Sequence, residues 1–157
     1  MDKLHKDRID AVIASIKNAC VVDDPKKGLG FNMGVWRSKA YSEDMDLSGH
    51  ACGTVACIAG HTQIVAYNDK EFRKEAKHYG DYGEYPLKFS KHLDNANSMA
   101  GAYLGLAPYE ASHLFLGSHF RRDGIYADLE SITPKEAIKV LKHLKKTGEV
   151  TWDVAST

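Results

Sequence analysis

The chain has 157 residues, of which 43% are hydrophobic and 27% charged, and its 21 basic and 21 acidic side chains leave no formal net charge. This length suits a single domain with its own core, expected over residues 1–157. The charge balance speaks against nucleic acid as a partner, because such partners usually leave a basic excess. No apolar run approaches the roughly 20 residues of a membrane span, and the charged N-terminus is unlike a signal peptide. With three cysteines, an odd number, the chain fits a reducing compartment, so we expect a cytoplasmic protein without a membrane partner.

Apolar spacing predicts a mainly α-helical domain of about five helices, with long irregular loops and at most a small β element. The longest loops are expected over residues 21–49 and 117–131. The first helix should run from about Lys3 to Ala19, because apolar residues recur there at helical spacing. A central helix is expected over about residues 53–67, where nearly every side chain is small or apolar, so most of its circumference should be buried.

Capping signals locate the later helices. Asn68 followed by Glu71 predicts the start of a short, solvated helix. A helix over about 93–105 and a shorter one opened by Pro108 should form a hairpin. The last helix has the clearest signals, and Trp152 behind it should cover an edge of the core. These signals are Thr133 as cap, Pro134 at the first helical position, Glu136 to complete a capping box, and Gly148 as the left-handed end.

The stretch HACGTVACIAGH, residues 50–61, places two histidines and two cysteines close together. On a helix, Cys57 and His61 would lie four residues apart on one face and could share a metal ion. His50 and Cys52 could supply two further ligands, so a small zinc-supported domain is one hypothesis. The spacing differs from the usual structural zinc patterns, which begin with two cysteines separated by two to four residues.

A second hypothesis makes Cys52 a nucleophile, and a third makes the stretch a packing motif. Cys52 would precede the central helix, where the helix dipole lowers a thiol pKa, as a cysteine-dependent hydrolase requires. Such an enzyme also needs a histidine base, for example His113, and the sequence cannot place one nearby. In the packing interpretation, Gly53, Cys57 and Gly60 form a small-residue stripe against another helix. We favour the packing interpretation, because it requires neither a metal ion nor a further catalytic residue.

Other candidate binding residues are weaker. Tyr82 and Tyr85 belong to an aromatic cluster that could be a contact surface or could pack its own loop. Arg121 and Arg122 could bind a phosphate, although RRDG is also an ordinary exposed turn. The lysines of the last helix are interpreted as a solvated helix face.

Four sequence blocks together resemble a family of small uncharacterised proteins from bacteria and their phages. These blocks are FNMGVW, CGTVACIAGH, AYLGLAPYEASHLF and ITPKEAIKVLKHLKKTGEVTW, and they span residues 31–152. The resemblance carries no known activity. It implies an accessory protein, and a phage setting would favour binding or inhibition of a host factor.

The sequence therefore favours a small soluble accessory protein that binds another protein over an enzyme. No cofactor is expected unless the zinc hypothesis holds. The identity of the protein partner cannot be read from the residues.

Overall fold

The computed structural model describes residues 1–21, 30–31, 55–76, 93–116, 121–122, 125–126 and 131–156. These residues form six α-helices, a short 3-10 helix and four strands of two residues each, which confirms the predicted mainly α-helical fold. In chain order the elements are α1 (Lys3–Val21), β1 (Gly30–Phe31), β2 (Val55–Ala56), α2 (Ile58–Asn68), α3 (Lys70–Ala76), α4 (Leu93–Leu104), α5 (Pro108–Phe115), β3 (Arg121–Arg122), β4 (Ile125–Tyr126), α6 (Pro134–Thr147) and η3 (Asp153–Ala155).

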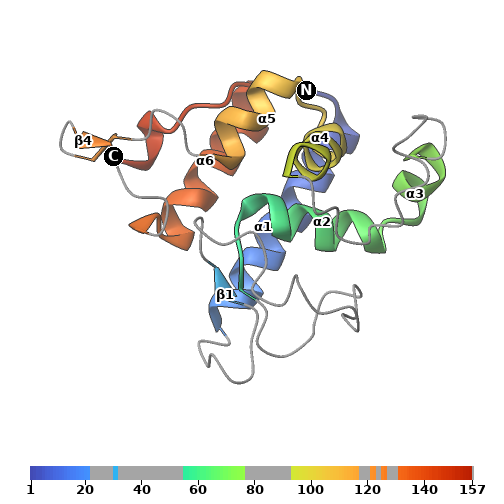
Figure 1. The fold of residues 1–157 in the computed structure, drawn as a ribbon, viewed down its shortest axis with the longest axis horizontal. Helices are drawn as coiled ribbons and strands as arrows, with labels where there is room; N and C mark the ends of the chain where they lie inside the picture. The colour runs from blue at the N-terminus through green and yellow to red at the C-terminus, as the bar shows by residue number, and fades with distance from the viewer. Residues whose placement is uncertain are drawn as a thin grey trace.

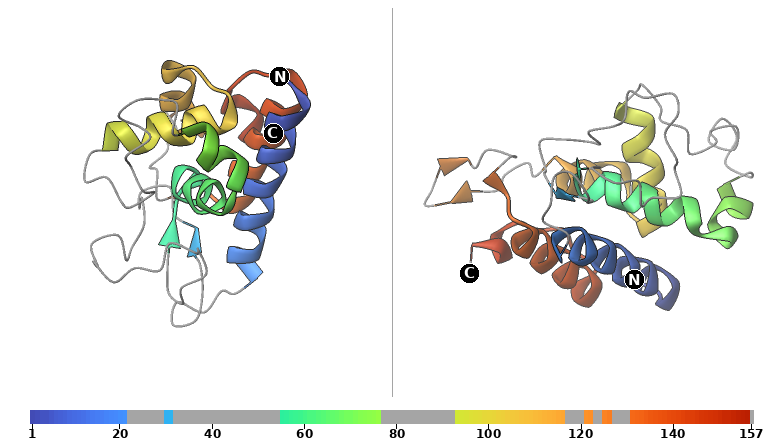
Figure 2. Two further views of the ribbon diagram at one scale, coloured as in Figure 1. Left: turned by 90° about the vertical axis from the view of Figure 1, so that its right-hand side faces the viewer. Right: turned by 90° about the horizontal axis from the view of Figure 1, so that it is seen from below.

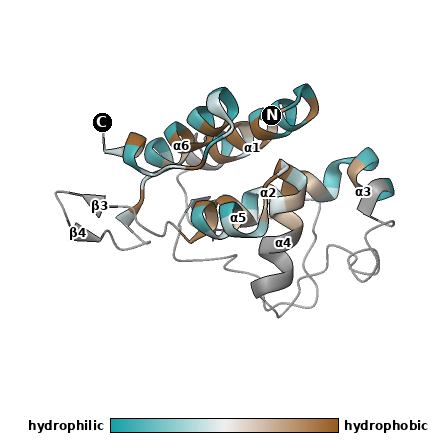
Figure 3. Cartoon of the chain, turned by 90° about the horizontal axis from the view of Figure 1, so that it is seen from above, coloured by the Kyte–Doolittle hydropathy of each residue, from teal (hydrophilic) through white to brown (hydrophobic). Residues whose placement is uncertain are grey.

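The helices lie in two layers. Helices α1 and α6 lie side by side in one layer, while α2, α4 and α5 lie in the other (Figures 1, 2 and 3). Helix α2 packs against α1, α4 and α5, so it occupies the central position that the sequence predicts. Among the described residues, no helix is both long and apolar enough to cross a membrane.

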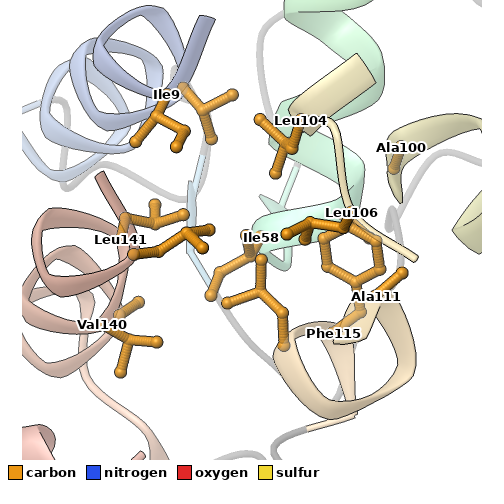
Figure 4. Packing of buried hydrophobic residues seen from close by; sticks show 14 of the residues in the cluster. Ile9, Ile58, Ala100, Leu104, Leu106, Ala111, Phe115, Val140 and Leu141 are labelled. Atoms are coloured by element: carbon orange, nitrogen blue, oxygen red, sulfur yellow. The ribbon is translucent and has the colours of Figure 1, made fainter. Parts of the chain in front are cut away.

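The core is formed where the two layers meet. Ile58, the first residue of α2, is fully buried and lies between Leu141 of α6 and Phe115 of α5 (Figure 4). Burying an isoleucine or leucine side chain contributes roughly 1.5–3 kcal/mol, so these contacts between elements distant in sequence hold the layers together. The apolar stripe predicted for α1 is also buried, through Ile9, Val12, Ile13 and Ile16.

The central helix begins at Ile58, later than the expected residue 53. Val55 and Ala56 instead form strand β2, which pairs in parallel with β1 in the register Gly30 to Val55 and Phe31 to Ala56. Extended backbone at these positions cannot be helical, and the β-branched Val55 suits a strand. Cys57 therefore lies at the N-cap in an extended conformation, where the sequence predicted a residue inside the helix.

The next helix boundary is also shifted by one residue. Asn68 is the last residue of α2, and it is Asp69 that caps α3: its Oδ1 accepts hydrogen bonds from the backbone N–H groups of Glu71 and Phe72, both 3.0 Å long. The side-chain amide of Asn68 instead donates a hydrogen bond to the backbone carbonyl of Ile64 in α2. Both residue types are good N-caps, so the local sequence does not distinguish them.

Helices α4 and α5 form the predicted hairpin. Gly105 has φ +72°, a left-handed conformation that ends α4, and the backbone N–H of Leu106 donates to the carbonyl of Gly101. Gly101 also lies very close to α5, because a Cβ built there would lie 2.7 Å from the Cβ of Ala111. Two helices thus approach each other at a position where only glycine fits.

Helix α6 has the ends that the sequence predicts. Thr133 Oγ1 accepts from the backbone N–H of Glu136, the Glu136 carboxylate accepts from the backbone N–H of Thr133, and Gly148 ends the helix with φ +83°. Trp152 is buried, as expected, and its indole N–H donates to the carbonyl of His113 at 2.9 Å. The segment after α6 is thereby tied to α5.

Candidate functional site

Of the four residues proposed as zinc ligands, the structure describes Cys57 and His61. Both are buried in the core at the start of α2. His50 and Cys52 lie outside the described residues, as do Tyr82 and Tyr85. The zinc and nucleophile hypotheses therefore stay predictions, while burial of Cys57 and Gly60 supports the packing interpretation at those two positions.

The environment of Cys57 favours its thiol over its thiolate. Burial raises the pKa of the Cys57 thiol, and the nearby backbone N–H groups of Gly60 and Ala59 counteract this only in part. The thiolate is the form that attacks electrophiles and binds metals. Although Cys57 stands at a helix N-terminus, desolvation outweighs the helix dipole, so this residue behaves as a core side chain.

We expect Cys57 to resist alkylation in the native protein. Treatment with iodoacetamide at neutral pH should label Cys57 at least about 100-fold more slowly than in the chain denatured with guanidinium, because reaction requires an opening that exposes the thiol. Peptide mapping separates Cys57 from Cys20 and Cys52. Equal rates in the native and denatured chains would contradict the buried position of Cys57, and fast native labelling of Cys52 alone would support the nucleophile hypothesis.

His61 is fully buried and forms a hydrogen bond with α1. Its Nδ1 lies 2.9 Å from the Oγ of Ser15, which is also buried. Serine next to histidine is the beginning of a nucleophilic pair, but such a pair must also reach a substrate. Because both side chains are enclosed by the core, we interpret this hydrogen bond as a connection between α1 and α2.

A second buried polar cluster joins α1 to the other end of α2. The guanidinium group of Arg8 is 4% exposed, and its Nε lies 3.5 Å from Oδ2 of Asp69. It also lies over the rings of Tyr103 and Phe72, at 4.7 and 5.1 Å from their centroids. The two rings meet edge to face at 4.8 Å. We call these residues, Arg8, Asp69, Phe72 and Tyr103, the Arg8 cluster.

The polar and aromatic groups of the Arg8 cluster contact one another. Burial raises the pKa of Tyr103, and the negative charge of Asp69 and its hydrogen bond to the phenol act in the same direction. The guanidinium is stabilised by the Asp69 carboxylate, by two aromatic faces and by a long contact to the Tyr103 carbonyl. The cluster therefore joins α1, α3 and α4 to Asp69, the residue between α2 and α3, and its polar groups contact one another.

Sequence reasoning missed both connections between α1 and α2. Arg8 and Ser15 lie seven residues apart, so they share one edge of the α1 stripe, next to Val12. Both are buried, and they hold Asp69 and His61 at opposite ends of α2. Polar residues border the apolar stripe of most amphipathic helices, so this spacing does not by itself predict that Arg8 and Ser15 are buried.

The remaining predicted residues are placed only in part. Arg121 and Arg122 form strand β3, which pairs antiparallel with Ile125–Tyr126. Their side chains and the rest of the RRDG stretch lie outside the described residues, so the phosphate site and the exposed turn both stay predictions. His113 is partly buried on α5. Across the described ranges, three or more histidine, cysteine or acidic side chains nowhere gather in a way that could hold a metal ion.

The exposed apolar side chains lie elsewhere. Large hydrophobic residues are exposed on α5 and at its C-cap, and at the start of the chain on and before α1: Tyr109 at 71%, Leu116 at 49%, Leu4 at 46% and Met1 at 41%. Tyr109 lies in the first turn of α5, and Leu116, its C-cap residue, lies seven residues later with helical backbone angles, so the two share one side of the helix. We call this pair the α5 face.

Comparison with known proteins identifies no family. A scan against protein-family models gives no match, and searches of curated proteins and of solved structures likewise find no similar protein.

Proposed function

We propose that this chain is a small accessory protein that acts by binding another protein, with the α5 face as part of the contact. The observation that carries the proposal is the exposure of Tyr109 and Leu116 on one side of α5. Tyrosine is enriched at protein interfaces, because it offers a large amphipathic surface at a low cost in side-chain entropy.

The α5 face is held in a fixed position. Helix α5 packs closely on α4 at Gly101 and Ala111, and its last turn is anchored by the hydrogen bond from Trp152 to the His113 carbonyl. A fixed backbone limits the ordering cost of association, so an exposed aromatic side chain on it is well suited to bind. By contrast, Cys57, His61 and Ser15 are buried, so they support packing better than catalysis.

The sequence resemblance to small bacterial and phage proteins suggests where the partner protein would be found. An accessory protein of a phage or bacterium would act on a protein of the bacterial cell, and inhibition of a host factor is one form of such action. We therefore choose a bacterial lysate as the source of the partner.

The proposal predicts a partner that depends on the α5 face. Immobilised wild-type protein should retain a stoichiometric protein from the lysate, and Tyr109→Ala/Leu116→Ala should retain it at least about 10-fold less, because truncating a central aromatic anchor usually costs more than 1 kcal/mol. The matched control is Leu4→Ala, which removes a similarly exposed apolar side chain from α1 and should bind like wild type.

Two outcomes would contradict the proposal. One is a wild-type protein that retains no stoichiometric partner. The other is a partner retained equally by wild type and the double variant. Urea unfolding of each variant controls for folding, since exposed substitutions usually change stability by less than about 0.5 kcal/mol.

A further inference from the structure

The outer side of α6 carries four exposed lysines in a row. Lys135, Lys139, Lys142 and Lys146 are all exposed, and we call them the lysine stripe. At 100° per residue they fall within an arc of about 60°, and the stripe is about 16 Å long. It lies opposite the buried face of α6, which consists of Ala137, Val140, Leu141 and Leu144.

The charges of the lysine stripe are not neutralised by the described part of the chain. Lys145 of α6 forms an ion pair with Asp10 of α1, but Lys145 does not belong to the stripe. Glu136, near the start of the helix, is held at the N-cap by Thr133. No described carboxylate lies within ion-pair distance of the four stripe lysines.

Part of this arrangement works against the stability of α6, although Lys146 lies in the last turn, where the helix dipole favours a positive charge. Successive stripe lysines are three or four residues apart, a spacing at which like charges repel on a helix. Lys135 also lies in the first turn, where the helix dipole disfavours a positive charge. The chain as a whole carries no net charge, so the excess positive charge is local to this face. The repulsion between neighbouring lysines, which no described ion pair offsets, suggests a role in binding.

We infer that the lysine stripe is a docking surface for an acidic segment of a partner protein. This inference rests on the proposed function and adds the chemistry of the partner. A segment with carboxylates spaced along about 16 Å complements the stripe, and such pairing increases the association rate and fixes the register of a complex. Nucleic acid fits less well, because the stripe contains no aromatic ring on which bases could stack.

The test uses a fluorescently labelled oligoglutamate of about 12 residues, which is long enough to span the stripe. Binding is followed by fluorescence anisotropy at low salt, with a thymidine oligonucleotide of similar charge as the competing class of ligand. Lys135→Gln/Lys139→Gln/Lys142→Gln is expected to bind oligoglutamate at least about 10-fold more weakly than wild type. The control, Lys3→Gln/Lys17→Gln/Lys70→Gln, removes three exposed lysines from α1 and α3 and should change binding less than about 2-fold.

Three results would overturn the inference: undetectable binding of oligoglutamate to wild type, equal loss in both triple variants, or tighter binding of the oligonucleotide through the same lysines. The Tyr109→Ala/Leu116→Ala variant should bind oligoglutamate like wild type. If oligoglutamate does not bind through the stripe lysines but a partner dependent on Tyr109 is found, the inference about the stripe alone is refuted. If oligoglutamate binds through the stripe but no such partner exists, the α5 proposal alone is refuted.

Discussion

Replacing Arg8 by methionine is expected to lower the free energy of unfolding by about 3 kcal/mol. Methionine keeps most of the aliphatic length of arginine but removes the charge. The carboxylate of Asp69 then loses its ion pair, and the rings of Tyr103 and Phe72 lose the cation that lies over them. Removing one partner of a buried charge pair costs more than the pair contributes, because the other charge is left uncompensated. Urea unfolding followed by circular dichroism measures the change.

A matched control uses the same substitution at the surface. The guanidinium of Arg73 lies over the ring of Tyr67, 5.7 Å from the centroid, but its side chain is exposed. Arg73→Met should therefore cost less than about 1 kcal/mol. If Arg8→Met and Arg73→Met destabilised the protein equally, the Arg8 cluster would not be the connection between helices that its geometry indicates.

Gly101→Val should destabilise the protein by a similar amount, about 3 kcal/mol. Even the first carbon of a side chain at this position would lie 2.7 Å from the Cβ of Ala111, so α4 and α5 would have to move apart. Ala102→Val on the same helix is the control, because Ala102 is exposed and its substitution tests only the lower helix propensity of valine. Thermal or urea unfolding of the two variants gives the comparison.

An exchange of methyl groups sharpens the test of this contact. Gly101→Ala/Ala111→Gly moves one methyl group from α5 to α4 and restores the original volume at the contact. The double variant should be more stable than the sum of the two single changes predicts, by at least about 1 kcal/mol. Strict additivity would mean that the two helices adjust independently and that the close approach is not a constraint.

Local signals predicted some elements well. Helix α6 was predicted at both ends, because a capping box, a proline at the first position and a left-handed glycine act within a few residues of each other. The end of α4 at Gly105 and the start of α5 at Pro108 depend on similarly local chemistry. In each case the residues that determine the boundary are neighbours in the chain.

Other boundaries depend on distant residues. The start of α2 was predicted too early because strand β1, which holds Val55 and Ala56 extended, lies far away in the sequence. Asp69 replaced Asn68 as the cap of α3, and Asp69 also pairs with Arg8, a residue from the first helix. Arginine is seldom buried, so composition alone gives no reason to expect Arg8 in the core.

The candidate site was predicted less well than the fold. The spacing of Cys57 and His61 indicated a shared face but could not show that both side chains are enclosed. The α5 face was missed for the opposite reason: Tyr109 continues an ordinary helical pattern, and only the packing of α4, α5 and Trp152 shows which side of α5 remains exposed.

The pairing of α1 with α6 has a consequence during synthesis on the ribosome. The first helix of the chain packs against the last long one, and Lys145 reaches back to Asp10 across most of the sequence. At roughly 5–20 residues per second, α1 is exposed for several seconds or longer before α6 emerges. During that interval the buried stripe of α1, which includes Ile9, Val12 and Ile16, can contact α2 and α4 but not α6. Completion of the fold therefore depends on contacts of high sequence separation that form late.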